Sequence, residues 1–305
     1  MKQLFSLLLL CCMNLVSAQR VESPTGPLAL TFQLTPDGQP TYAVSYKNKP
    51  VVLSSALGVS LKDKTALVNH FEVTGTTTHA VNETWKPVLG EQAQIVNHYN
   101  ELIVALVQKD SKVKLNLVFR AFDEGVAFRY DFPKQENLNY FIISDEKTEF
   151  NLTENNKVFW IPGDFDSNEY VYNETKFSEI DNEKLNLNNG IGVKSIPGKY
   201  TVQTPLQMKS PSGLYLNIFE AAVVNYPVMH LDANVQKYRL KANLVPNAIG
   251  DKAYLQAPCV SPWRTIMVSD DARKIVSSKM ILNLNEPSKI EDTSWIKPMK
   301  YIGVW

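Results

Sequence analysis

The sequence predicts an all-β fold, a large antiparallel β-sandwich. Apolar and polar side chains alternate along several short segments. Turn residues recur roughly every ten residues, and few stretches show the period of a helix. Many short strands with regular turns are typical of two sheets packed face to face.

The alternating segments pair into hairpins where a turn sequence joins them. Leu28–Leu34 and residues 42–46 alternate on either side of Pro36-Asp37-Gly38. Residues 113–122 and 126–132 form a second hairpin around an Asp-Glu-Gly turn. Shorter strands are predicted further along the chain at residues 140–143, Lys157–Trp160, 214–219, 237–244 and 280–284.

One helix is predicted near the end of the sandwich. Ser269 is a suitable N-cap residue, and Asp270 and Asp271 complement the positive end of the helix dipole. Residues 272–278 then supply about two turns. We expect this helix to link strands.

Residues 177–198 are polar, rich in Asn and contain three glycines. They predict a long loop, with one helical turn at residues 178–185. A long loop on a rigid sandwich often carries function, whereas a disordered connector has the same composition. The sequence leaves both interpretations open.

The N-terminal segment is typical of a secretory signal peptide. Met1-Lys2 is a basic start, residues 4–10 are apolar, and Val16-Ser17-Ala18 supplies small residues. The apolar run is too short to span a membrane. We expect residues 1–18 to be removed and the protein to be secreted, into the periplasm of a Gram-negative bacterium.

Cysteine usage leaves the mature chain without an intrachain disulfide. Cys11 and Cys12 lie in the predicted signal peptide, where the small residue that usually precedes a lipoprotein cysteine is missing. Only Cys259 remains after cleavage. The exported protein must therefore be held together by its core.

Composition excludes several classes of function. The 31 Lys and Arg residues balance the 31 Asp and Glu residues, so the chain lacks the charge excess of a protein that binds nucleic acid or an anionic membrane. Hydrophobic residues make up 44% of the chain, which is enough to bury a core. We expect no nucleic-acid partner and no membrane span.

Sequence motifs for nucleotides and zinc are absent. The chain has no glycine-rich phosphate loop and no zinc spacing of Cys and His. Its four histidines are scattered, and each is better explained as a surface or hydrogen-bonded core residue than as a metal ligand: His70, His79, His98 and His230.

The loop predicted after Lys157–Trp160 contains the densest group of side chains that could bind a ligand or a metal ion. Asp164, Asp166 and Glu169 place three carboxylates close together, with Asn168 among them. Oxygen ligands on a loop suit Ca²⁺ better than a transition metal, although the spacing is not that of an EF-hand. Solvation of a turn explains the two aspartates equally well, so this segment does not define a site by itself.

A set of aromatic and acidic segments is distributed along the chain. It comprises Thr84-Trp85-Lys86-Pro87, Asn97-His98-Tyr99-Asn100-Glu101-Leu102, Phe128-Arg129-Tyr130, Phe159 to Asp164 with Glu169-Tyr170, Gly213-Leu214-Tyr215, Glu220-Ala221-Ala222, Pro262-Trp263-Arg264-Thr265-Ile266, Val268 to Arg273, Leu282 to Pro287 and Lys300 to Trp305. Together these segments resemble the N-terminal domain of glycoside hydrolase family 97, especially the α-glucosidases of bacterial starch-utilisation systems.

The resemblance implies a galactose-mutarotase-like sandwich that precedes a (β/α)₈ catalytic barrel. We expect a signal peptide at residues 1–18 and the sandwich at 19–293. Residues 294–305 would be a linker and the first strand of a missing barrel, because the apolar run 301–305 has no turn or polar tail after it. The catalytic residues would lie beyond Trp305, and none is predicted in this chain.

The resemblance also implies an active-site calcium ion. In the family, barrel glutamates supply most of the ligands, and the one ligand from the N-terminal domain matches Glu169 by motif. Asp164 and Asp166 match no ligand. We therefore expect Ca²⁺ as the cofactor of the full-length enzyme, with Glu169 as the one metal ligand in this chain.

Two functions remain open. The first is the supporting domain of an α-glycosidase, either an α-glucosidase acting on starch-derived, α-linked oligosaccharides or an α-galactosidase, and inactive without its barrel. The second is a stand-alone carbohydrate-binding module without catalysis. Mutarotase activity needs an acid/base pair, and no histidine is placed by motif for it. The apolar run at residues 301–305 favours the first function.

Overall fold

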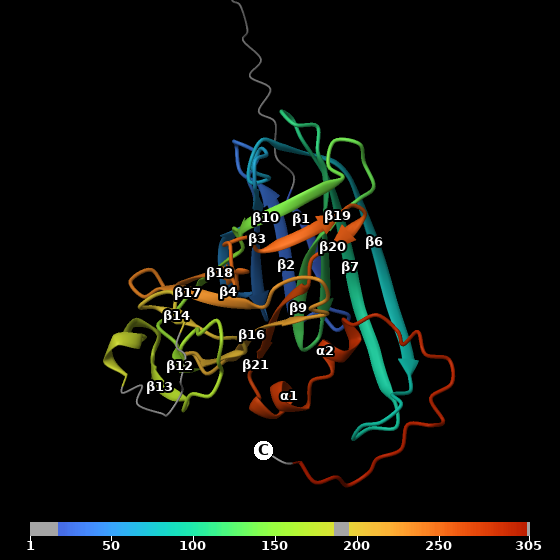
Figure 1. The fold of residues 1–305 in the computed structure, drawn as a ribbon, viewed down its shortest axis with the longest axis vertical. Helices are drawn as coiled ribbons and strands as arrows, with labels where there is room; N and C mark the ends of the chain where they lie inside the picture. Colours follow the sequence, from blue (N-terminus) through green and yellow to red (C-terminus); the bar gives the residue numbers. More distant parts are fainter. Residues whose placement is uncertain (1–17, 186–194, 304–305) are drawn as a thin grey trace, which may run out of the picture.

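The computed structural model describes residues 18–185 and 195–303, whose strands form two large sheets and a small one (Figure 1). The paired strands in these ranges run antiparallel. This confirms the predicted all-β antiparallel architecture. The predicted signal peptide lies outside the described residues, apart from Ala18.

The eight-stranded sheet contains the first predicted hairpin, β2 and β3. Gly38, in the turn between them, has φ +76° and lies so close to Phe71 that a Cβ atom would stand 2.6 Å from its backbone nitrogen. Only glycine fits there. In spatial order the strands are β1 (Gln19–Glu22), β2 (Leu28–Leu34), β3 (Pro40–Tyr46), β4 (Lys49–Ala56), β11 (Glu149–Leu152), β18 (Arg239–Leu244), β17 (Met229–Asn234) and β14 (Thr201–Val202).

The ten-stranded sheet contains the second predicted hairpin, β8 and β9. In spatial order its strands are β13 (Asn173–Lys176), β12 (Lys157–Trp160), β15 (Leu206–Lys209), β16 (Tyr215–Ala221), β21 (Trp263–Ser269), β9 (Gly125–Phe132), β8 (Lys114–Phe122), β7 (Ile95–Gln108) and β6 (Phe71–Trp85), and β20 (Cys259–Val260) pairs with β9. The small sheet has the order β19 (Ala253–Gln256), β10 (Tyr140–Glu146) and β5 (Val59–Leu61).

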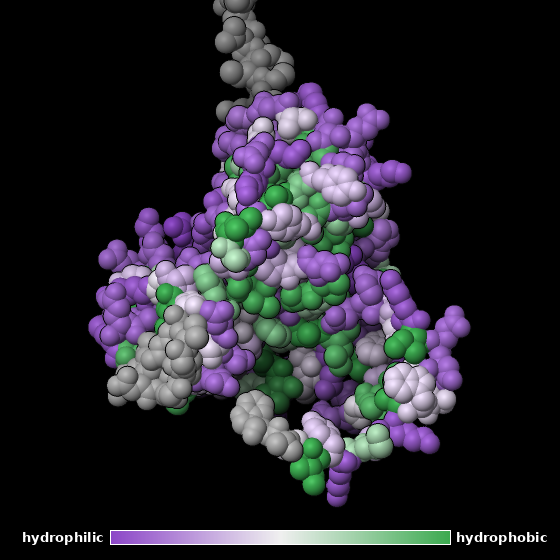
Figure 2. Space-filling view, viewed as in Figure 1, coloured by the Kyte–Doolittle hydropathy of each residue, from purple (hydrophilic) through white to green (hydrophobic). Residues whose placement is uncertain are grey.

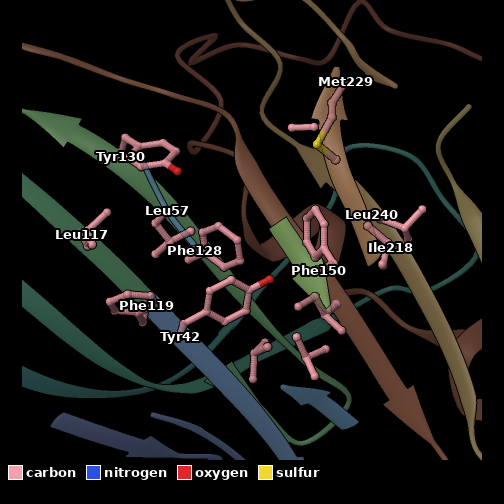
Figure 3. Close-up of a cluster of buried hydrophobic side chains, with 14 of the residues drawn as sticks. Tyr42, Leu57, Leu117, Phe119, Phe128, Tyr130, Phe150, Ile218, Met229 and Leu240 are labelled. Atoms are coloured by element: carbon pink, nitrogen blue, oxygen red, sulfur yellow. The ribbon is translucent and has the colours of Figure 1, made fainter. Parts of the chain in front are cut away.

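The core lies between the two large sheets and is rich in aromatic rings (Figure 3). Tyr42 on β3 packs against Phe128 on β9, with ring centroids 4.7 Å apart, and Phe150 on β11 meets both rings. The Tyr42 hydroxyl donates to the Glu149 carbonyl at 2.8 Å, which satisfies the one polar atom of this ring. Burial of each such ring contributes about 1.5–3 kcal/mol.

The predicted helix is present, but its N-cap is different. Helix α1 spans Ala272–Ser277, and Asp271 caps it by accepting from the Arg273 amide at 3.0 Å. Ser269 ends strand β21 instead, and its hydroxyl accepts from the Asp271 amide at 3.0 Å. The prediction of Ser269 as N-cap was wrong because the strand continues to that residue.

The strand predicted at residues 280–284 was wrong. This segment forms helix α2, Met280–Asn283, and Met280 and the following Leu284 belong to the same buried apolar cluster as Trp263, separate from the main core. Asn283 accepts from the Trp85 indole and donates to the Val96 carbonyl, both at 2.9 Å. The apolar run looked strand-like, but its buried residues are spaced by three and four, as in a helix.

The described part of the predicted loop 177–198 is ordered by buried side chains. Two 3-10 turns, η1 (Phe177–Glu179) and η2 (Asn182–Lys184), replace the single predicted turn. Phe177 is fully buried, and the Asn182 amide donates to the carbonyls of Gly198 and Thr201 at 2.8 Å. In its described parts this segment is therefore not a disordered connector, while residues 186–194 lie outside the described ranges.

Residues 301–303 carry no regular secondary structure and are exposed, and residues 304–305 lie outside the described ranges. A strand at 301–305 is therefore absent as far as this segment is described, because no neighbouring strand pairs with it there. Its role as the first strand of a barrel stays a prediction. Among the described residues, no helix is long and apolar enough to cross a membrane.

A buried arginine joins the small sheet to the ten-stranded sheet. Arg264 on β21 is fully buried, and its Nε and Nη2 donate to Glu146 on β10 at 2.9 and 2.7 Å. Its Nη1 donates to Glu220 on β16 at 2.5 Å. The hydroxyls of Tyr226 and Thr148 also donate to Glu146, at 2.9 and 2.7 Å.

Burial and pairing act in opposite directions on these charges. Burial lowers the pKa of Arg264, but its two glutamates outweigh this effect and raise the pKa. Burial raises the pKa of Glu146, yet the charge and hydrogen bonds of Arg264 hold that pKa below its usual value. Burial dominates at Glu220 and raises its pKa. Arg264 and Glu146 therefore form a charged pair in the folded protein.

Replacing the arginine should unfold the sandwich at lower denaturant concentration. Arg264→Ala would leave Glu146 and Glu220 buried without their cation, so the free energy of unfolding should fall by about 3–5 kcal/mol in urea titrations. Arg273→Ala is the matched control, because that side chain is 91% exposed in its pair with Asp271. The control should shift stability by no more than about 0.5 kcal/mol. Equal effects of the two changes would contradict the role of the buried pair.

Candidate functional site

The loop between β12 and β13 is anchored at its base to β14. Pro162 bridges Val202, and the Gly163 amide donates to the Thr201 carbonyl at 2.9 Å. A Cβ atom on Gly163 would lie 2.5 Å from the Thr201 Cγ2 atom. The close approach requires glycine and fixes where the acidic segment begins.

Asp164 organises this loop from the inside. Its side chain is only 2% exposed. One carboxylate oxygen accepts from the amides of Asp166 and Ser167 at 2.8 and 3.2 Å. The other accepts from the Tyr170 hydroxyl at 2.6 Å and from the Ser195 amide at 3.2 Å. Four donors, three from the same turn and one from Ser195, therefore converge on one buried acid.

These donors keep Asp164 ionised. Burial raises its pKa, but the hydrogen bonds from Tyr170 and the backbone amides outweigh burial and hold the pKa below its usual range. Burial and the bond to Asp164 raise the pKa of the Tyr170 hydroxyl, which stays a donor. Of the two interpretations left open for Asp164, simple solvation of a turn does not hold, since its carboxylate is buried and shapes the turn.

Glu169 lies on the exposed outer side of the same turn, as do Asp166 and Asn168. The Glu169 amide donates to the Ser167 hydroxyl at 3.2 Å, and the Ser195 hydroxyl donates to Asp166. The Gln203 amide donates to the Ser167 carbonyl at 2.7 Å. Contacts from Ser195 and Gln203 thus hold the turn on its inner side, while Glu169 lies at the surface.

The described residues do not by themselves fit a bound calcium ion. Within residues 18–185 and 195–303, no group of three or more His, Cys, Asp or Glu side chains is arranged to hold a metal. Calcium takes six to eight oxygen ligands. The structure brings Asp164 and Asp166 into the same turn as Glu169, but Asp164 faces inward and its oxygens already accept hydrogen bonds.

His230 on β17 lies beneath this loop and was not predicted to matter. It is 5% exposed, and its ring stacks on Phe165 with centroids 5.7 Å apart. Burial lowers the pKa of His230 to about 4, although Asp164 and Asp232 oppose that shift. The imidazole is therefore neutral at pH 7 and supports the loop by packing.

The other predicted residues lie elsewhere. His70 pairs with Asp110 and His79 lies 3.2 Å from Glu101, both with half-exposed side chains, and His98 is exposed. The contacts that hold the loop come from Ser195, Thr201, Gln203 and His230. Sequence patterns did not single these residues out, because they are 31 to 66 positions away from Asp164 along the chain. Only spatial contact identifies them.

Comparison with protein families gives a match over most of the chain. A family model described as the N-terminal domain of glycosyl hydrolase 97 matches residues 21–287. Among curated proteins, a retaining α-galactosidase of Bacteroides thetaiotaomicron is 24% identical to this chain. The alignment covers 100% of this chain and 47% of the length of that protein. A probable retaining α-galactosidase of Streptomyces bingchenggensis is 25% identical, over 92% of this chain and 40% of its own length.

Solved structures agree with this match. A family 97 enzyme from Pseudoalteromonas sp. strain K8, in complex with acarbose, is 33% identical and superposes with a TM-score of 0.79. The match covers 92% of this chain and 40% of that enzyme. A variant of the same enzyme was solved with panose. The chain thus spans less than half the length of these relatives.

The buried histidine should make stability depend on pH. Because the folded pKa of His230 is about 4 and the unfolded value is about 6.5, the unfolded state binds more protons between these values. The free energy of unfolding should therefore fall as pH drops from 6.5 to 4. His230→Gln should remove about 1–3 kcal/mol of that fall in denaturant titrations across this range. His98→Gln, an exposed change, is the control, and an unaltered pH profile in His230→Gln would contradict the assignment.

Proposed function

Because the chain belongs to glycoside hydrolase family 97, we propose that it is the N-terminal supporting domain of a longer, exported, calcium-dependent α-glycosidase. The observation that carries this proposal is the match of the family's N-terminal domain to residues 21–287. The antiparallel sandwich agrees with that domain, and the relatives are more than twice as long as this chain. We propose that the catalytic domain follows residue 305 in the complete protein.

The buried acids of the sandwich are poor candidates for catalysis. Glycoside hydrolysis generally needs two carboxyl groups that flank the scissile bond. Glu146 and Glu220 are enclosed around Arg264, and Asp164 accepts four hydrogen bonds inside its turn. None of these three side chains is free to exchange a proton with a sugar, which favours catalytic residues in another domain.

Glu169 is proposed as the contribution of this chain to the active site. Its exposed position on a turn with a rigid base would let one carboxylate reach across a domain interface. Because the described residues offer no further cluster of ligands, the remaining oxygens would have to come from the catalytic domain. When bound, a calcium ion would supply positive charge that orients sugar hydroxyls and stabilises developing negative charge. The part of this chain is to hold Glu169 in place.

The proposed substrate is an α-linked oligosaccharide of glucose. The relative at 33% identity was solved with acarbose, and a variant of it with panose, which is an oligosaccharide of α-linked glucose. The relatives at 24 and 25% identity are named as retaining α-galactosidases, so an α-galactoside is the second candidate. Export to the periplasm is proposed from the signal-like residues 1–18.

Removing the Glu169 carboxylate should weaken calcium binding in the complete protein. Glu169→Gln keeps the size of the side chain but loses its charge, so calcium affinity measured by calorimetry should fall about tenfold or more. Hydrolysis of nitrophenyl α-glucoside should fall in parallel and recover at higher calcium concentration.

Asp166→Asn is the matched control, because Asp166 is an exposed acid on the same turn. It should change calcium affinity less than about threefold. The assignment of Glu169 fails if its variant binds calcium as tightly as the unmodified protein, or if the Asp166 variant loses equally much.

The sandwich alone should be inactive. Residues 19–305 should bind no calcium with micromolar affinity in calorimetry, because one exposed carboxylate supplies too few ligands. They should also fail to turn over nitrophenyl α-glucoside, whereas the complete protein should hydrolyse it. Turnover by residues 19–305, with intact folding confirmed by thermal unfolding, would place the catalytic acids in this domain. Inactivity of the complete protein would favour a carbohydrate-binding module without catalysis.

A further inference from the structure

The small sheet presents two exposed tyrosines on its outer face. In the pairing of β10 with β19, Tyr140 lies opposite Gln256 and Ile142 lies opposite Tyr254. Side chains alternate across a strand, so these four residues share one face. Tyr140 is 67% exposed and Tyr254 is 56% exposed. The alternate residues of the two strands face the core instead: Phe141, Ile143, Ala253 and Leu255.

The two rings lie close enough to contact one ligand. Tyr140 and Tyr254 are diagonal neighbours in the ladder, which places such residues about 7–8 Å apart. Ile142 lies beside them on the same face and is partly buried. Because the strands are fixed by the core beneath them, the two tyrosines form a rigid platform.

Hydrogen bonds fix the Tyr254 ring in advance. Its hydroxyl donates to Asp251 at 2.6 Å, and the Asn247 amide lies 3.4 Å from the same hydroxyl oxygen. Asp251 also pairs with Lys62, whose Nζ lies 2.9 and 3.0 Å from the two carboxylate oxygens. The charges next to the platform therefore neutralise each other, while hydroxyl and amide groups remain at its edge.

A hollow of about 900 Å³ begins at the platform. Tyr254 and Gln256 are among the residues that line it, as are Lys252 and Val260, whereas Tyr140 is not. Val224, which is 67% exposed, lines it as well. Figure 2 shows hydrophobic residues across the middle of this face of the molecule, next to and mostly below the place where Figure 1 draws β10 and β19. A ligand that lies on the tyrosines can extend into this space.

We propose that Tyr140 and Tyr254 form a binding platform for a neutral oligosaccharide, outside the loop that carries Glu169. The flat C–H face of a pyranose ring is apolar and packs on an aromatic ring, while its hydroxyls pair with polar groups at the edge. Gln256 and the Tyr254 hydroxyl supply such groups. Paired charges beside the platform favour a neutral ligand over an anion. The choice of a sugar rests on the proposed glycosidase function.

Affinity electrophoresis of the complete protein tests the platform. Gels that contain soluble starch or galactomannan distinguish a glucose chain from a galactose-bearing one. The double variant Tyr140→Ala with Tyr254→Ala should weaken retention in at least one gel about fivefold or more, because both stacking rings are lost. Tyr254→Phe keeps the ring and should retain most of the binding. Leu53→Ala is the surface control, because Leu53 on β4 is an apolar residue that is 47% exposed.

Kinetics separate this inference from the proposed function. Turnover of nitrophenyl α-glucoside, which is too small to span both regions, should stay within about twofold in the double variant, while KM for a long oligosaccharide should rise. Failure of the unmodified protein to hydrolyse any glycoside would overturn the proposed function but leave the gel result readable. The platform is disproved if neither gel retards the unmodified protein, or if the double variant is retarded equally. Should the double variant not fold, the single change Tyr140→Ala at an exposed position gives the same test.

Discussion

The burial of Arg264 between Glu146 and Glu220 is the constraint on which the rest of the structure depends. Each buried charge would cost several kcal/mol if its partner were displaced, so the strands that carry these residues have little freedom to shift. Glu146 comes from β10 in the small sheet, while Arg264 and Glu220 come from neighbouring strands of the ten-stranded sheet. The pair therefore sets how the small sheet closes over the end of the aromatic core, and with it the position of the outer face of β10 and β19.

Acids with satisfied hydrogen bonds also fix the structure locally near the surface. Asp164 is buried and collects donors from its own turn and from Ser195, and the turn then presents Glu169 outward. Asp251 accepts from Tyr254 and pairs with Lys62, and the tyrosine ring is presented outward. In each case an acid whose hydrogen bonds are satisfied inside the protein lies next to a side chain that is exposed at the surface. Such preorganisation lowers the entropy lost when a ligand binds.

Prediction from the sequence succeeded where apolar and polar side chains alternate along a strand. β2 matches its predicted range, and β8 and β9 begin within one residue of theirs, because their side chains alternate. β21 was not predicted as a strand from its pattern, since all seven of its residues are buried and nothing alternates. β6 was missed for the opposite reason: it lies at the sheet edge and most of its side chains are exposed. Helix α2 was mistaken for a strand because its apolar run, residues 280–282, is too short to show a helical period in the sequence.

The sequence by itself determined the fold class, the family and the loop that carries Glu169, because these depend on local patterns and on motifs that lie within short segments. The tertiary structure alone decided the role of each acid. Asp164, Asp166 and Glu169 look alike along the chain, yet one is buried under donors from residues up to 31 positions away and the others face solvent. Tyr140 and Tyr254 likewise share one face of the small sheet although they are more than a hundred residues apart in the sequence. Burial and long-range contact arise only when the sheets pack, and no local pattern encodes them.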